Sequence, residues 1–90
     1  MISDTVQLKE DLLSMGYDGV VIFENPSFVD AFVGVTTNNQ AVYDYEKMIG
    51  CLMEEDSMTE DEAIEFIEYN TIRSLPYYDN APIIFKPIAR

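Results

Sequence analysis

Carboxylates without any accompanying base are the side chains of this sequence best equipped for chemistry. The stretch from residue 54 to residue 68 contains neither lysine nor arginine. Its acids are Glu54, Glu55, Asp56, Glu60, Asp61, Glu62, Glu65 and Glu68. Such groups can ligate Ca²⁺ or Mg²⁺, exchange protons in catalysis, or present negative charge to a basic partner. The rest of the sequence decides among these three kinds of chemistry.

Catalysis and tight metal binding both lack the residues that they need. The chain has no histidine, and its one cysteine, Cys51, falls among the apolar positions of a predicted helix. A zinc site needs several such ligands, and a nucleophilic thiol needs an activating base. The acids do not follow the spacing of an EF-hand, and no glycine-rich phosphate loop is present. We therefore predict no enzyme activity, no catalytic residue, no metal and no cofactor, with Ca²⁺ binding in the acidic stretch left open as an alternative.

A general property of helices explains only part of the acidic stretch. Acids in the first turn of a helix interact favourably with its dipole, which accounts for residues 60–62. Residues 54–56 end the preceding helix, where negative charge is unfavourable. Two interpretations stay open: a solvated face that keeps the protein soluble, or an acidic surface that binds a partner. The acids predicted to contact such a partner are Glu54, Glu55, Asp56, Asp61, Glu65 and Glu68.

The segment after the acidic stretch places one arginine among tyrosines. Arg73 is the only base in residues 48–85, and Tyr69 precedes it by one helical turn. In one interpretation Arg73 pairs with a carboxylate or caps the helix end, while Tyr77 and Tyr78 cover a sheet edge. In the other interpretation these side chains form a protein-binding patch, because tyrosine and arginine are enriched at interface hot spots. Tyr69 and Arg73 therefore join the predicted partner-binding residues.

Length and net charge narrow the class of partner. Ninety residues, 48% of them hydrophobic, are enough for one domain with a core, so we predict a single domain over residues 1–90. A formal net charge of -12 disfavours nucleic acid and anionic membranes, and it makes a basic protein surface the natural complement. The sequence has no membrane-spanning stretch, no signal-peptide pattern and no pair of cysteines. These features predict a cytoplasmic protein.

The elements that would position these residues follow from apolar periodicity and turn signals. Helices are predicted over about residues 5–15, about 45–55 and about 60–75, the last behind a Thr59–Glu62 capping box. Strands are predicted at residues 20–23, 28–35, 41–44 and 83–85, with a hairpin turn at 36–40. Gly34 is a candidate for a β-bulge, and the prolines beside residues 83–85 favour an edge strand. The order α-β-β-β-α-α-β predicts an α+β fold, in which helices cover one face of an antiparallel sheet of about four strands.

About half of the sequence resembles a group of small proteins. The resemblance is carried by Val42-Tyr43-Asp44-Tyr45, by Met58-Thr59 and Glu62-Ala63 at a helix start, and by Glu68-Tyr69-Asn70-Thr71 through Leu75-Pro76. It is to small uncharacterised proteins of Gram-positive bacteria and their phages or prophages, and it implies a mobile-element context without an activity or site residues. Small acidic phage proteins include inhibitors, anti-CRISPR proteins among them, that present carboxylates to the basic nucleic-acid channels of host nucleases.

Two functional hypotheses follow. The first is a non-enzymatic acidic module that docks on a basic surface of a host nucleic-acid-binding protein. Its most concrete form is a phage-encoded inhibitor that acts as a nucleic-acid mimic, as an anti-CRISPR protein does. The alternative is a homo-oligomeric structural or accessory module, which associates through the sheet edge and the Tyr77–Tyr78 segment, with its acids serving only solubility. Neither hypothesis involves direct binding of nucleic acid or of a membrane.

Overall fold

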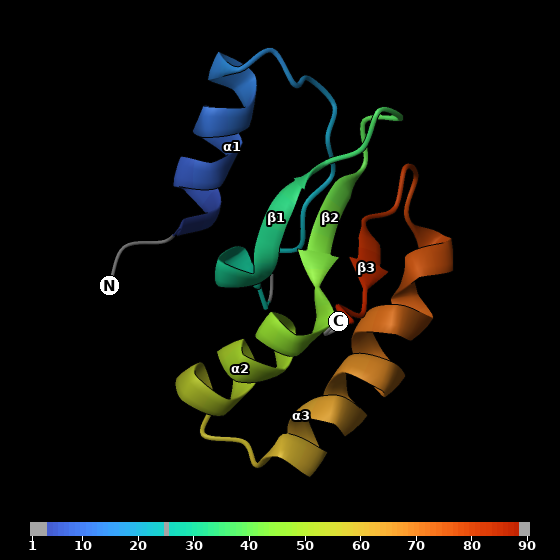
Figure 1. The fold of residues 1–90 in the computed structure, drawn as a ribbon. Helices are drawn as coiled ribbons and strands as arrows, with labels where there is room; N and C mark the ends of the chain where they lie inside the picture. The colour runs from blue at the N-terminus through green and yellow to red at the C-terminus, as the bar shows by residue number, and fades with distance from the viewer. Residues whose placement is uncertain (1–3, 25, 89–90) are drawn as a thin grey trace.

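The computed structural model describes residues 4–24 and 26–88 (Figure 1). Its α-helices are α1 (Asp4–Ser14), α2 (Tyr45–Glu55) and α3 (Glu60–Phe66), and its strands are β1 (Phe32–Val35), β2 (Ala41–Asp44) and β3 (Ile83–Phe85). A 3-10 turn, η1 (Val29–Ala31), precedes β1. A π-helical turn, η2 (Ile67–Ile72), continues α3, and a 3-10 turn, η3 (Leu75–Tyr77), ends this helical segment. The order α-β-β-α-α-β confirms the α+β class.

Within residues 4–24 and 26–88 the sheet is mixed and has three strands in the order β1-β2-β3. β1 and β2 form the predicted antiparallel hairpin, and its register shifts between Phe32 and Gly34, next to the glycine at which an irregularity was expected. β3 lies at an edge as predicted, but it runs parallel to β2, so the prediction of a purely antiparallel sheet is wrong. The helical segment from α3 to η3 returns the chain to the end of the sheet where β2 begins (Figure 1). The Asn80 Nδ2 group donates to the Asn39 carbonyl at 2.7 Å there, and β3 therefore starts beside the start of β2.

The predicted strand at residues 20–23 does not form. This segment pairs with no strand, although Ile22 and Phe23 are buried. The Phe23 N–H group instead donates to the Tyr43 Oη atom at 3.1 Å. This hydrogen bond to a side chain of β2 holds the segment against the sheet. The next predicted strand begins at residue 32 and not at 28. Phe28 has a φ of 50° and opens the η1 turn, so the backbone is not extended before residue 32.

An aromatic cluster joins this crossing segment to the sheet and to the end of the long helical segment. The Phe23 ring lies 4.7 Å from the Tyr43 ring, 5.8 Å from the Phe28 ring and 6.0 Å from the Tyr78 ring, measured between centroids. Tyr43 and Phe28 are almost completely buried. Because Tyr78 directly follows η3, the cluster fixes the carboxyl end of the helical segment relative to the sheet. This fixed end in turn sets where the rest of the helical segment lies relative to the sheet.

Side chains cap the start of both helices in the α2–α3 hairpin. The Asp44 side chain caps α2 by accepting the Lys47 N–H group at 3.2 Å. Thr59 and Glu62 form the predicted capping box, with reciprocal bonds of 3.2 Å and 2.9 Å. Figure 1 shows the two helices as a hairpin at the end of the sheet where β2 finishes. The buried side chains of the hairpin are Tyr45, Met48, Ile49, Cys51, Leu52, Ala63, Ile67 and Thr71.

The first helix is held more loosely than the hairpin. α1 buries Leu12 but leaves Val6 and Leu13 more than half exposed, as is Met15 directly after the helix. Figure 1 shows it beside β1, away from α2 and α3. Among the described residues, no helix is long and apolar enough to cross a membrane.

Candidate protein-binding surface

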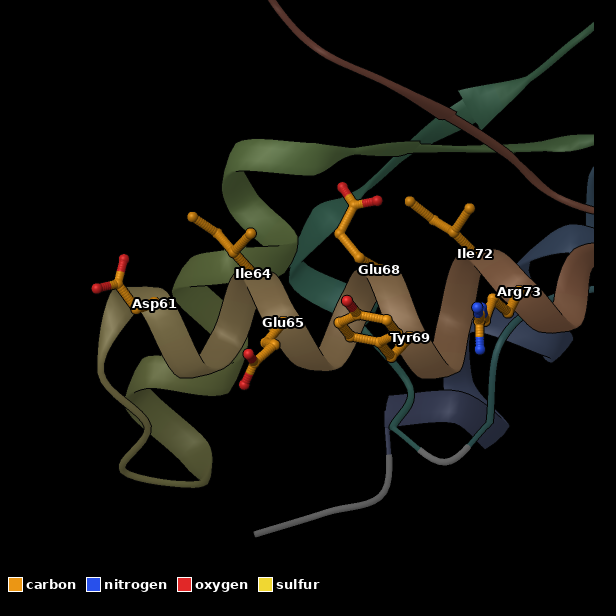
Figure 2. A pocket seen from close by; sticks show the side chains of 7 residues that line it. All are labelled: Asp61, Ile64, Glu65, Glu68, Tyr69, Ile72 and Arg73. Carbon is orange, nitrogen blue, oxygen red and sulfur yellow. The ribbon is translucent and has the colours of Figure 1, made fainter.

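Five of the eight predicted partner-binding residues line one surface hollow of about 600 Å³ (Figure 2). They are Asp61, Glu65, Glu68, Tyr69 and Arg73. Two isoleucines, Ile64 and Ile72, complete the lining. Successive lining residues are three positions apart or are neighbours, which is the spacing of one face of a helix. We call this surface, formed by α3, η2 and Arg73, the α3 hollow.

The lining side chains of the α3 hollow form two rows. Figure 2 shows Ile64, Glu68 and Ile72 projecting to one side of the helical segment. Glu65 and Tyr69 project from another side of it in the same view. Both isoleucines are half-buried and pack against the core, so they supply apolar surface between charged groups. The hollow therefore combines carboxylates, an aromatic ring and aliphatic carbon, and it is not purely acidic.

Glu68 is held in place from the neighbouring helix. The Tyr45 hydroxyl, on buried Tyr45 of α2, donates to the Glu68 Oε2 atom at 2.8 Å. On Tyr45 itself, the Lys86 Nζ atom lies 4.8 Å from the ring centroid. A carboxylate fixed in this way loses less side-chain entropy when a partner binds its free oxygen. The α3 hollow thus contains one preorganised acceptor, which the sequence did not reveal because Tyr45 and Glu68 are 23 residues apart.

Arg73 stacks on Tyr69. The guanidinium carbon lies 5.3 Å from the centroid of the Tyr69 ring, within the range of a cation–π interaction. Tyr69 is 60% exposed. Among the described residues the structure contains one salt bridge, between Lys9 and Glu24 at 2.7 Å, so of the two structural roles considered for Arg73 the ion pair does not form within this part of the chain. Tyr69 and Arg73 instead form an exposed pair at one end of the hollow.

The other three predicted residues lie away from this hollow. Glu54 and Glu55 end α2, and Asp56 is its C-cap. Glu54 lines a separate hollow of about 360 Å³, together with Asp30 and Cys51 among other residues. The chain turns between residue 56 and the Thr59 cap, so the two halves of the acidic stretch belong to different helices with different exposed sides. The structure therefore divides the acidic stretch between two surfaces.

A second hollow adjoins the first along the same helical segment. It measures about 400 Å³. Its lining consists of Met58, Glu62, Glu65, Phe66, Tyr69 and Asn70. Glu65 and Tyr69 line both hollows, so these two side chains stand between them. We call this second surface the Phe66 hollow. Met58 and Phe66 are half-buried and pack against the core, and their remaining exposed surface lines this hollow.

Groups able to catalyse or to bind metal are scarce in the described residues. Cys51 is buried, as predicted. This burial is the main reason why the pKa of its thiol is raised to about 11, and the nearby Glu55 and Asp30 carboxylates add to the increase. A thiol with this pKa is almost entirely protonated at neutral pH and is a poor nucleophile. No cluster of three or more histidine, cysteine or acidic side chains that could hold a metal ion occurs within residues 4–24 and 26–88. The Ca²⁺ alternative consequently has no candidate set of ligands there.

Comparison with protein-family models, curated proteins and solved structures gives no match to this chain. Any functional proposal therefore rests on the geometry and charge of the α3 hollow and the Phe66 hollow.

Two buried tyrosines predict a loss of stability in alkaline solution. Burial raises the pKa of Tyr43 to about 12, and burial together with the Glu68 carboxylate raises that of Tyr45 to about 12. Since tyrosine in the unfolded chain ionises near pH 10, the stabilisation is complete below that pH and is lost as the pH rises towards 12. Urea unfolding at pH 8, 10 and 11 should show the free energy of unfolding falling between the last two values. Tyr45→Phe should reduce this fall, and a free energy constant up to pH 11 would contradict the prediction.

Proposed function

We propose that this protein is a non-enzymatic binding protein that docks the α3 hollow and the Phe66 hollow onto a basic surface of another protein. The observation that carries the proposal is the gathering of Asp61, Glu65, Glu68, Tyr69 and Arg73 around one hollow with an apolar lining. The sequence predicts the acids and the Tyr69–Arg73 pair separately, and three of the acids lie with that pair around the same hollow. A net charge of -12 adds long-range attraction for basic partners.

Charge by itself is too weak to account for stable docking. An exposed ion pair contributes about 0.2–1 kcal/mol, so three carboxylates contribute at most about 3 kcal/mol. Even a millimolar dissociation constant corresponds to about 4 kcal/mol. The apolar carbon of Ile64 and Ile72 and the exposed ring of Tyr69 supply the kind of surface that makes up the difference. This mixture supports a protein partner more than a simple counter-ion.

The most concrete form of the proposal is an inhibitor of a nucleic-acid-binding host protein. Fixed carboxylates can imitate phosphates and occupy arginine and lysine side chains already arranged for nucleic acid. Glu68, held by Tyr45, is one such fixed carboxylate. In this form the protein would be a phage-encoded, anti-CRISPR-like inhibitor, and the support for it is the charge and geometry of the α3 hollow.

Affinity capture followed by a salt titration tests the proposal. The protein would be immobilised, incubated with a lysate of a Gram-positive bacterium at 50 mM salt, and its retained partners identified by mass spectrometry. We expect a basic nucleic-acid-binding protein whose affinity, measured with the purified partner, falls by at least about tenfold between 50 and 200 mM salt. A partner whose affinity does not change with salt, or no retained protein, would contradict docking through carboxylates.

The homo-oligomeric alternative rests on a different observation. β3 is an edge strand whose Ile83 and Phe85 side chains are each 37% exposed, and Tyr77 is 90% exposed. An open edge with apolar side chains can pair with a second copy of the chain. Light scattering separates the two candidates, because a dimer that persists unchanged from 50 to 500 mM salt supports the edge interface, whereas a monomer supports docking on another protein.

A further inference from the structure

We propose that the partner presents arginine side chains to the two hollows, one on each side of the ridge formed by Glu65 and Tyr69. This inference rests on the proposed function and adds the chemistry of the partner's contact residues. The ridge is defined by the two residues that line both hollows. A partner that covers the surface must therefore straddle it.

Each hollow has the two features that a long basic side chain requires. The α3 hollow offers aliphatic carbon from Ile64 and Ile72 beside the Glu68 carboxylate. The Phe66 hollow offers Met58 and Phe66 beside Glu62. Arginine and lysine bury an apolar stem while they keep a charged head at a polar rim. Hollows of this composition fit such side chains better than they fit a purely apolar or a purely polar group.

The ridge favours arginine over lysine. Glu65 and Tyr69 are one helical turn apart, so a planar guanidinium can bond a carboxylate and lie against the aromatic ring at the same time. The ring already accepts a guanidinium, because Arg73 stacks on it at 5.3 Å. Its 60% exposure leaves more than half of the side chain open to a partner. Lysine carries a compact and strongly hydrated charge, and it gains less from such a ring.

The negative charge of the α3 hollow favours an arginine-bearing partner over a second copy of this chain as its occupant. Two copies would bring Asp61, Glu65 and Glu68 of one molecule towards the same carboxylates of the other, and Arg73 is the one basic residue that lines the α3 hollow of each copy. Each copy also carries a net charge of -12. Like charges placed opposite each other in an interface are strongly unfavourable. An arginine-bearing segment of a basic protein meets the same carboxylates with opposite charge.

Two synthetic peptides of equal length and charge test the inference. One is a helical peptide with arginine at every basic position, and the other has lysine at the same positions. By isothermal calorimetry at 150 mM salt, the arginine peptide should bind at least about tenfold more tightly, which corresponds to about 1.4 kcal/mol. Tyr69→Ala should remove most of this preference. Tyr77→Ala is the matched control, because Tyr77 is 90% exposed and lines neither hollow, and it should leave the preference unchanged.

The possible results separate failure of the inference from failure of the proposed function. If both peptides bind equally, or if Tyr77→Ala lowers the preference as much as Tyr69→Ala, the ridge does not select arginine and the inference is overturned. Docking of the acidic surface would survive that result. If neither peptide binds at 50 mM salt, the hollows do not recognise basic segments, and the proposed function is overturned together with the inference.

Discussion

Replacing Asp61 and Glu65 by lysine should lower the affinity for the basic partner about 50-fold. Each substitution removes an attraction and adds a repulsion of about 0.2–1 kcal/mol at an exposed site. Two substitutions therefore change about four pairwise interactions, which together amount to about 0.8–4 kcal/mol, and 50-fold corresponds to about 2.3 kcal/mol, near the middle of that range. Both residues line the α3 hollow. Glu68 is left intact in this variant because its carboxylate accepts the Tyr45 hydroxyl and its loss would also disturb the hairpin.

The matched control is the variant in which Glu54 and Glu55 are replaced by lysine. It changes the net charge of the protein by the same amount, but on the last turn of α2, outside both hollows. Because these two side chains line neither hollow, their charges act on the partner across solvent, where salt weakens them. We expect this control to lose less than about tenfold in affinity, measured by calorimetry with the partner identified by capture.

Comparing the two variants shows whether the affinity depends on the position of the acids or only on the net charge of the protein. Circular dichroism and thermal unfolding should show both variants folded, since all four side chains are exposed. Equal losses of affinity would mean that the acids act as a diffuse field, and the α3 hollow would then have no special role. Unchanged affinity in both variants would leave the acids as a solvated face that serves solubility.

Replacing Tyr43 by alanine should cost about 3–5 kcal/mol of stability, the range for removing a large aromatic side chain from a core. Tyr43 is fully buried, contacts the Phe23 and Phe32 rings, and accepts the Phe23 N–H group. At about 0.05–0.15 kcal/mol per residue, a domain of this size has a total stability of roughly 5–13 kcal/mol. Urea unfolding followed by circular dichroism should therefore show a large shift of the midpoint, or an unfolded protein.

Tyr43→Phe is the control for this prediction, because it keeps the ring and removes only the acceptor of the Phe23 N–H group. Leaving that buried donor without a partner should cost about 1–3 kcal/mol. A wild-type midpoint in Tyr43→Phe would mean that the hydrogen bond is not needed to hold residues 20–24 across the sheet. A similarly small effect of Tyr43→Ala would show that the aromatic cluster is not the centre of the core.

Several elements could be predicted because short segments encode them. The Thr59–Glu62 capping box begins α3 at Glu60, and the Asp44 cap begins α2 at Tyr45. The hairpin turn before Ala41 uses Asn39 at a φ of 66°, a conformation that asparagine tolerates. In each of these cases the determining contacts lie within about four residues of one another. Local spacing is then sufficient evidence for the structure.

Other features could not be predicted because they depend on contacts between distant segments. Residues 20–23 have the composition of a buried strand, but that composition reports burial and not pairing. Phe23 is buried by the Tyr43 and Tyr78 rings, and its N–H group bonds a side chain instead of a strand. The parallel direction of β3 likewise depends on where the helical segment from α3 to η3 returns the chain.

For the candidate surface, the charge, the helical spacing that brings Asp61, Glu65 and Glu68 together, and the closeness of Tyr69 to Arg73 follow from the amino-acid sequence. These are properties of one helix and need no tertiary contact. Three features depend on tertiary packing: Glu54 lines a hollow separate from that of Asp61 and Glu65, the Tyr45 hydroxyl holds Glu68, and apolar side chains line the hollows. The reason is physical: spacing along a helix sets which side chains are neighbours, whereas packing between helices sets which of them are exposed, held or buried.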